Sequence, residues 1–220
     1  IEARRLESQT FFEHYLAANG LAFGGKDMGM PRWVAIDCVA LPSASIGFAA
    51  QARDLPAGIQ RDLGIGSSYD GLVPVSMFTA VPSLGKNGTF VNPSLCSILP
   101  KEGLATASMA LALEAYGATA IRSIVQYDNA ALRVHSKFGR LDIDAAIVPV
   151  HDCADMTFVY HMIPGSQQME PTFLLDPHDT ARKRALHEDI MHGARYAVVA
   201  PGHVCRGDKQ YVPVARLDEV

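Results

Sequence analysis

The sequence predicts an α+β protein built around one mixed sheet, and three observations lead to this fold class. An alanine-rich stretch from Gly103 to Tyr116, closed by Gly117, is typical of a helix with a glycine C-cap. The continuous apolar run from Ala120 to Tyr127 is typical of a strand in the middle of a sheet. Helix-like and strand-like segments follow one another in irregular order, which does not fit regular βαβ units.

The N-terminal quarter is expected to hold two helices and two strands. Apolar residues recur at helical spacing up to Asn19-Gly20, which ends the first helix. Two apolar runs separated by residues 41–45 predict a hairpin. Asp54 can cap a short helix that has Pro56 in its first turn. These elements are expected over residues 4–18, 33–39, 46–51 and 54–63.

The middle of the chain is expected to begin with two extended segments. Pro74 limits the first of them to an edge or bulged strand, and Pro93 lies inside the second. Two helices with a buried strand between them follow, and Gly139 closes the second helix. The expected elements are 72–81, 89–99, 103–116, 120–127 and 129–138.

The last third is expected to contain a strand pair, a break at Pro164-Gly165, one helix and two further strands. The expected ranges are 143–150, 155–163, 178–192, 195–200 and 210–215.

The composition excludes several classes of protein. With 220 residues, 49% of them hydrophobic and 19% charged, the chain can bury one sizeable core. The net charge of −4 gives no overall attraction to nucleic acid. No apolar run reaches the roughly 20 residues of a membrane span, and the N-terminal segment lacks a signal-peptide pattern. Cys38, Cys96, Cys153 and Cys205 are scattered, which suits reduced thiols and a cytoplasmic protein.

A glycine-led turn opens the alanine-rich helix directly after the strand expected over residues 89–99. The first N–H groups of a helix have no carbonyl partner within it and lie at the positive end of the helix dipole. An anionic group such as a diphosphate can bind there. The alternative is an ordinary loop-to-helix junction with small residues for close packing. The amides concerned belong to Gly103, Leu104, Ala105, Thr106 and Ala107.

A polar pair, Asp128-Asn129, follows the buried strand, and His135 lies in the helix after it. Asp128 can cap that helix. Imidazole titrates near neutrality, so His135 is a candidate proton donor. A helix histidine without a chemical role is the alternative.

Two segments together resemble signatures of the Gcn5-related N-acetyltransferase (GNAT) superfamily. The segment LPKEGLA at residues 99–105 resembles the family's acyl-CoA loop, Arg/Gln-x-x-Gly-x-Gly/Ala. Residues 128–139 resemble the pattern Asn-x-x-Ala-x-x-x-Tyr-x-x-x-Gly, with Asp128 in the Asn slot and His135 in the Tyr slot. The order and spacing fit one strand between two helices.

The resemblance implies a mostly antiparallel central sheet flanked by helices over residues 1–163, and an αββ extension over residues 164–220 packed on the same domain. It implies acyl-CoA or an acyl carrier protein as donor, a small-molecule amine as acceptor, and no metal. The extension is expected to cover the acceptor pocket or to form a homodimer contact. The residues implied to bind CoA are Ile98, Leu99, Lys101, Gly103, Leu104, Ala105, Thr106, Ala107, Asp128 and Asn129.

The chain departs from the family pattern at two points. Pro100 stands where the family has Arg or Gln, so the loop loses a cation that faces the phosphates unless Lys101 replaces it. The strand 89–99 has no Asp or Glu to accept the proton of the amine. A water chain, a residue from elsewhere or an amine that is already neutral must then do that work.

Other residues carry competing interpretations. Cys96 and Ser97 are candidate nucleophiles, whereas a small core residue is the alternative for Cys96. The basic run 182–184 is expected to be a solvated helix face or a contact for an acidic carrier protein.

A rival function is a metal- or cysteine-dependent hydrolase that uses His151, Asp152, Cys153 and His161, although their spacing fits no standard zinc signature. A third possibility is a non-catalytic acyl-CoA-binding module, because the usual tyrosine and a strand carboxylate are both missing.

Overall fold

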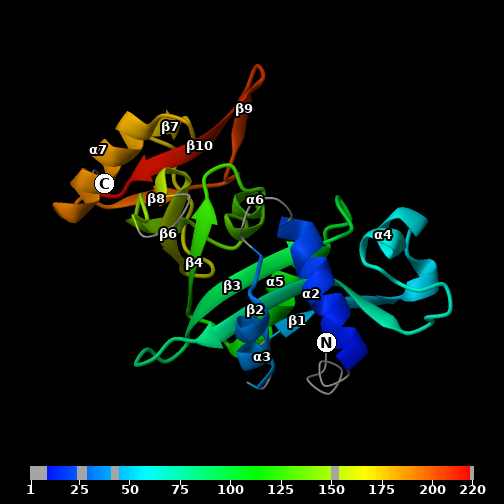
Figure 1. Ribbon diagram of the computed structural model, residues 1–220. Coiled ribbons are helices and arrows are strands. Elements are labelled where there is room, and N and C mark those ends of the chain that lie inside the picture. Colours follow the sequence, from blue (N-terminus) through cyan, green and yellow to red (C-terminus); the bar gives the residue numbers. More distant parts are fainter. Residues whose placement is uncertain (1–8, 24–28, 41–44, 150–153, 219–220) are drawn as a thin grey trace. The chain divides into compact units, whose positions relative to one another are not determined.

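The computed structural model describes residues 9–23, 29–40, 45–149 and 154–218 (Figure 1). The chain forms two compact units. The first comprises residues 1–83 and 92–117, and the second comprises residues 84–91 and 118–220. The boundary that we predicted at residue 163 therefore lies inside the second unit.

The first unit combines helices with the strands β1, β2 and the last part of β3. In chain order the elements are α2 (Gln9–Phe23), α3 (Arg32–Ala40), β1 (Ser45–Gln51), the 3-10 turn η1 (Ala52–Asp54), α4 (Ala57–Asp62), β2 (Leu72–Pro82), β3 (Thr89–Ser97) and α5 (Leu104–Tyr116).

β2 lies between β1 and β3 in this unit, and its pairing with β1 is antiparallel and irregular. The register shifts between Phe48 and Ala49, whose partners are Ser76 and Pro74. Proline has no N–H to donate to the hydrogen-bond ladder, so a β-bulge beside it is expected. The bulged strand that we predicted from Pro74 is confirmed. Gly47 lies against the Ser76 carbonyl, where a Cβ atom would collide with the backbone.

Aromatic residues of α2 form much of the core of the first unit. Phe11, Phe12 and Tyr15 are buried together with Val73 and Met77 of β2. The Tyr15 hydroxyl lies 2.8 Å from Oγ1 of Thr79 and 3.3 Å from Oγ of Ser45, so a buried phenol has its polar partners.

The strand predicted over residues 33–39 is wrong, because these residues belong to helix α3. Ala35 and Cys38 are buried three residues apart, whereas Trp33 and Ile36 are 68% and 50% exposed. That spacing is helical. Pro31 directly precedes α3, and its carbonyl accepts a hydrogen bond from the Ala35 amide at the start of the helix, where proline is tolerated. The hairpin that we predicted from strands 33–39 and 46–51 is therefore also wrong, since β1 pairs with β2. Residues 41–44 of its expected connection lie outside the described residues.

The second unit is built on a sheet with the order β3-β4-β6-β5-β8-β10-β7, and β9 pairs with β10. Helices α6 and α7 and the 3-10 turn η2 accompany the sheet. The bounds are β4 (Ala120–Gln126), α6 (Ala131–His135), β5 (Leu141–Ala145), η2 (Ala154–Met156), β6 (Thr157–Met162), β7 (Phe173–Leu175), α7 (Thr180–Met191), β8 (Tyr196–Val198), β9 (Val204–Arg206) and β10 (Lys209–Arg216).

The predicted fold class, α+β with a mixed and mostly antiparallel sheet, is confirmed. β3 and β4 run parallel, with Thr89 opposite Ala120 and Val91 opposite Arg122. The pairs β1–β2, β4–β6, β5–β6, β5–β8, β8–β10, β7–β10 and β9–β10 are antiparallel.

The C-terminal extension continues the sheet of the second unit. β8 pairs with β5 on one side and with β10 on the other, so residues after 163 complete the same layer. The predicted helix and two strands of this region are present as α7, β8 and β10. β7 and β9 were not predicted, because three residues are too few for a periodic pattern.

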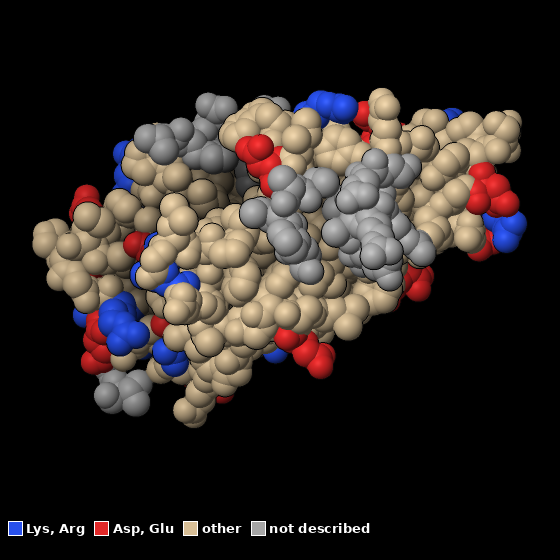
Figure 2. Space-filling model, turned by 90° about the horizontal axis from the view of Figure 1, so that it is seen from below, with Lys and Arg blue, Asp and Glu red and all other residues tan. Residues whose placement is uncertain are grey.

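Charges of both signs are interspersed on the face drawn in Figure 2, with no extended basic patch on the described residues of that face. Within the described ranges, no helix combines the length and the apolar character needed to cross a membrane.

The basic run of α7 is not a uniformly solvated face, because Lys183 is buried. Its ammonium donates to the carbonyl of Pro177 at 2.6 Å and to the carbonyl of Asp155. It also lies 5.5 Å from the centre of the Tyr127 ring. Lys183 therefore fastens α7 to the rest of the unit. Arg184, its neighbour, is exposed and lies 3.7 Å from Asp155.

Replacing Lys183 by Met is expected to lower the free energy of unfolding by about 1–3 kcal/mol, because the buried carbonyl of Pro177 and the partly buried carbonyl of Asp155 lose their donor. Arg184→Met is the matched control and should cost less than about 1 kcal/mol, since it removes only an exposed ion pair. Urea denaturation of both variants measures the difference. Equal losses would contradict a buried, hydrogen-bonded role for Lys183.

Candidate functional site

The loop between β3 and α5 in the first unit is the part of the candidate site with the most unusual backbone. Ile98 is buried and its amide donates to the Val75 carbonyl at 3.0 Å, which ties the end of β3 to β2. Residues 100–103 are exposed. Lys101 has φ 68°, the one described non-glycine residue with a left-handed backbone, and Gly103 has φ 73°. A left-handed backbone conformation costs energy for any residue other than glycine, and residues in such conformations are enriched at functional sites.

Helix α5 begins directly after this loop. Gly103 is its N-cap residue and provides no side-chain hydrogen bond to the first turn. The first bond of the helix joins the Ala107 amide to the Gly103 carbonyl at 3.0 Å. A Cβ atom at Gly103 would meet nothing within 4 Å, so the space before the helix is open. The amides of this turn have the geometry of an anion-binding helix N-terminus.

Buried hydroxyls fix α5 on the sheet of the first unit. Ser108 Oγ lies 2.9 Å from Ser76 Oγ, and Ser76 Oγ donates to the Cys96 carbonyl at 3.0 Å. Ser108 and Met109 are fully buried. The helix that carries the amides is therefore held by both β2 and β3.

The structure argues against Cys96 as a nucleophile. Cys96 is buried, and burial raises the pKa of its thiol to about 12. At neutral pH it is a protonated thiol in the core, which corrects our expectation of a reactive group. Ser97 is partly exposed, and its hydroxyl donates to the Leu99 carbonyl at 3.2 Å. The described cysteines, Cys38, Cys96 and Cys205, form no disulfide.

The polar pair Asp128-Asn129 lies in the second unit, at the start of α6. Oδ1 of Asn129 accepts the Ala131 amide at 2.9 Å and so holds the beginning of the helix. This hydrogen bond comes from Asn129, one residue after the Asp128 that we expected to cap the helix. Asp128 is exposed and precedes the turn.

His135 also lies in the second unit and is 2% exposed, which corrects our expectation of a titrating, accessible imidazole. Its Nδ1 is hydrogen-bonded to the Tyr160 hydroxyl, and within the described part of the chain Nε2 has no hydrogen-bond partner. Burial lowers the pKa of His135 to about 4. The ring is therefore neutral at physiological pH and cannot donate a proton as an imidazolium.

His161, a residue of the rival hydrolase, takes part in an ion-pair row across the second unit's sheet. Arg122, His161 and Asp142 lie opposite one another on β4, β6 and β5. Nδ1 of His161 lies 2.7 Å from Asp144, which also binds Arg122 at 2.8 Å. The hydrogen bond to Asp144 raises the pKa of His161. Asp142 and Asp144 are two residues apart on β5 and therefore share one face of the strand. This spacing is the sequence signal for the row, and we did not predict the row from it.

The acidic residues of this row are paired with His161 and with arginines. Among the described residues, no group of three or more His, Cys, Asp or Glu side chains is arranged to hold a metal ion. Three of the four residues of the rival hydrolase, His151, Asp152 and Cys153, lie outside the described residues. What the structure does place near His161 is Asp142 and Asp144, each of which is neutralised by an arginine.

Comparison with known proteins gives structural likenesses only. No protein-family model matches the chain, and no curated protein sequence matches it. The NatC complex bound to Gag peptide and CoA is 11% identical, covers 69% of this chain and 91% of its own, and has a TM-score of 0.48. The ribosomal-protein-S18-alanine N-acetyltransferase of Escherichia coli is 11% identical, with coverages of 76% and 95% and a TM-score of 0.46.

A GNAT-family acetyltransferase from Bacillus anthracis is 13% identical, covers 74% of this chain and 91% of its own, and has a TM-score of 0.42. Two of these three structures are acetyltransferases, and the other holds CoA.

The buried state of His135 predicts a loss of stability in acid. The pKa of this ring is about 4 in the folded protein, whereas an exposed imidazole has a pKa of 6.5, so the unfolded chain binds more protons between these pH values. The contribution of the neutral His135 ring to the free energy of unfolding is complete above pH 6.5. It is lost as the pH falls toward 4, by roughly 3 kcal/mol in total.

His135→Gln should remove this part of the pH dependence, measured as the free energy of unfolding in urea at several pH values. The control is His178→Gln, which replaces an exposed histidine of the same unit and should leave the slope unchanged. Identical pH slopes for wild type and His135→Gln would contradict a buried neutral imidazole.

Proposed function

We propose that the chain is an acyltransferase that moves an acyl group from an acyl-CoA or acyl-carrier thioester to the amine of a small molecule. The observation that carries the proposal is the exposed loop of residues 100–103, which presents a left-handed Lys101 and Gly103 at the N-terminus of α5. The loop lies within the first of the two segments that resemble GNAT signatures.

The loop has the properties that a diphosphate needs. Amides of residues 103–106 would hold phosphate oxygens, whereas the Ala107 amide that we also expected to bind is already bonded to the Gly103 carbonyl. The dipole of the 13-residue helix α5 favours negative charge at this end. Lys101 is exposed and adds a cation in place of the arginine or glutamine that the family has at Pro100. Glu102 opposes it, so the main-chain amides are the principal binding groups.

Acyl-CoA, when bound, would supply the thioester whose carbonyl the amine attacks, and CoA thiol would leave as the carbon–sulfur bond breaks. The residues of this chain favour direct transfer, because Cys96 is a buried thiol and cannot form an acyl-enzyme as a thiolate. The leaving group is a thiol with a pKa of roughly 8.5, so its departure needs little help from an acid. This fits a site in which His135 is neutral and buried.

The non-catalytic acyl-CoA-binding module is the second candidate. The burial of His135 favours it, because the slot that holds a tyrosine in the family contributes no accessible proton donor here. Both candidates require the loop of residues 100–103 to bind CoA, and they differ in turnover. Release of free thiol from acyl-CoA in the presence of small amines separates them.

Gly103→Ala is expected to weaken CoA binding about tenfold. A side chain at φ 73° strains the backbone by roughly 1–2 kcal/mol and displaces the amides that face the phosphates. Gly64→Ala is the matched control, since Gly64 has φ 66° and open space around it but lies after α4. Both variants should lose similar stability, and calorimetric titration with CoA and with acetyl to long-chain acyl-CoA should show weaker binding for Gly103→Ala alone.

Wild-type protein that binds none of these donors would overturn the proposed loop site. Binding without thiol release, over a panel of amines, would overturn the acyltransferase and leave the binding module. Tight binding of all donors with equal affinity in both glycine variants would show that the thioester carrier sits elsewhere.

A further inference from the structure

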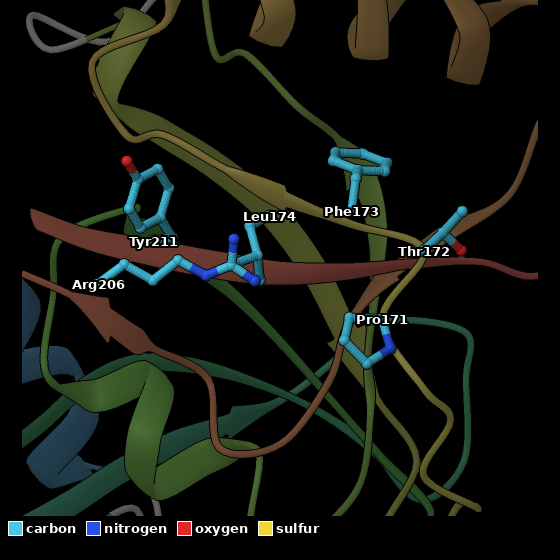
Figure 3. Close-up of a pocket in the computed structure, with 6 residues that line it drawn as sticks. All are labelled: Pro171, Thr172, Phe173, Leu174, Arg206 and Tyr211. Atoms are coloured by element: carbon cyan, nitrogen blue, oxygen red, sulfur yellow. The ribbon is translucent and has the colours of Figure 1, made fainter.

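A surface pocket lies entirely within the C-terminal part of the second unit. It has a volume of about 480 Å³, within the range of small-molecule sites. Its wall is formed by the strand β7 with the residues before it and by the β9–β10 hairpin (Figure 3). The lining residues are Pro171, Thr172, Phe173, Leu174, Arg206 and Tyr211.

The strand registers place three of these side chains on one face of the sheet. Leu174 lies opposite Pro213, two residues from Tyr211 along β10. Arg206 lies opposite Lys209, which is also two residues from Tyr211. Because side chains alternate along a strand, Leu174, Tyr211 and Arg206 share a face. The residues of the opposite face, Leu175, Val212 and Val214, are buried in the core.

Neither Arg206 nor Tyr211 has a side-chain partner among the described residues. Within the described ranges, the Arg206 guanidinium makes no ion pair or hydrogen bond, and the Tyr211 hydroxyl makes no hydrogen bond. Their neighbours are engaged: Arg182 lies 4.7 Å from the Phe173 ring centre, and Lys209 lies 3.8 Å from Asp176. In Figure 3 the Arg206 guanidinium reaches toward Leu174 over the surface of β10.

As far as the described residues go, the pocket therefore offers a free cation and a free hydroxyl beside an apolar wall. A guanidinium binds carboxylate or phosphate through two parallel hydrogen bonds, and a phenol can add a third donor. Pro171 and Leu174 contribute apolar atoms that would contact a hydrocarbon or aromatic body. The ring of Phe173, which is opposite Val214, lies on the other face of the sheet. The carboxylate of Asp176, which follows β7, is paired with Lys209 and leaves the charge of Arg206 available.

We propose that this pocket binds a small organic anion, in which a carboxylate or phosphate group pairs with Arg206 and Tyr211 and an apolar or aromatic body packs on Leu174 and Pro171. The site lies within the second unit, whereas the loop of residues 100–103 belongs to the first, so the inference goes beyond the proposed acyltransferase.

The experiment titrates the full chain with benzoate, phenyl phosphate, inorganic phosphate and the neutral analogue benzamide at constant ionic strength, followed by amide chemical shifts and calorimetry. Wild-type protein should bind benzoate or phenyl phosphate, with shifts at Leu174 and Tyr211, and should bind benzamide and inorganic phosphate at least about tenfold more weakly. Preference for benzoate or for phenyl phosphate distinguishes a carboxylate ligand from a phosphate ligand.

Arg206→Ala should weaken binding of the preferred anion at least about tenfold, because a charged hydrogen-bond donor is lost. Tyr211→Phe should weaken it by a smaller factor. Arg61→Ala, which removes an exposed arginine from α4 in the first unit, is the control and should bind like wild type. Unchanged binding in Arg206→Ala, equal binding of benzamide, or no binding of either aromatic anion would each overturn the proposal. The readout is binding alone, so it is independent of whether the chain transfers acyl groups.

Discussion

The hydrogen bond between Ser76 and Ser108 is the interaction on which the candidate site depends most. It joins the middle of β2 to the second turn of α5, and Ser76 also donates to the backbone of β3. Both hydroxyls are completely buried, so each needs its partner and the pair admits few alternative arrangements. The helix is fixed in rotation as well as in position. Amides at its first turn can then face a ligand without a cost in ordering, which is the advantage of a preorganised site.

Burial also determines which chemistry the chain retains. Cys96 and His135 are two of the side chains that we expected to do nucleophilic or acid–base work, and burial keeps both of them uncharged at neutral pH. A site deprived of such groups must rely on positioning and on main-chain dipoles. The loop before α5 supplies both, because a strained Lys101 backbone and an exposed glycine open the space in front of the helix.

The sequence allowed the fold class to be predicted because its longest elements carry strong local signals. In α5 the alanine-rich stretch indicates a helix, and Gly103 and Gly117 mark its two ends. In α7 the side chain of Asp179 accepts the Arg182 amide and caps the start of the helix. The segment of α3 was misassigned, since a stretch of seven residues with six apolar ones fits a strand and a helix equally well. Depth of burial was the other failure. A pattern of residue types cannot tell that Tyr160 lies over His135, because that contact joins residues 25 positions apart.

The exposure of Trp33 has a practical consequence for the two-unit organisation. It is the single tryptophan of the chain and lies on α3, in the first unit, with 68% of its surface in contact with solvent. Indole emission therefore senses only that unit, whereas the circular dichroism of the peptide bonds averages over both. Superimposable melting curves from the two signals would indicate one cooperative transition, and separated curves would reveal that each half of the molecule melts on its own.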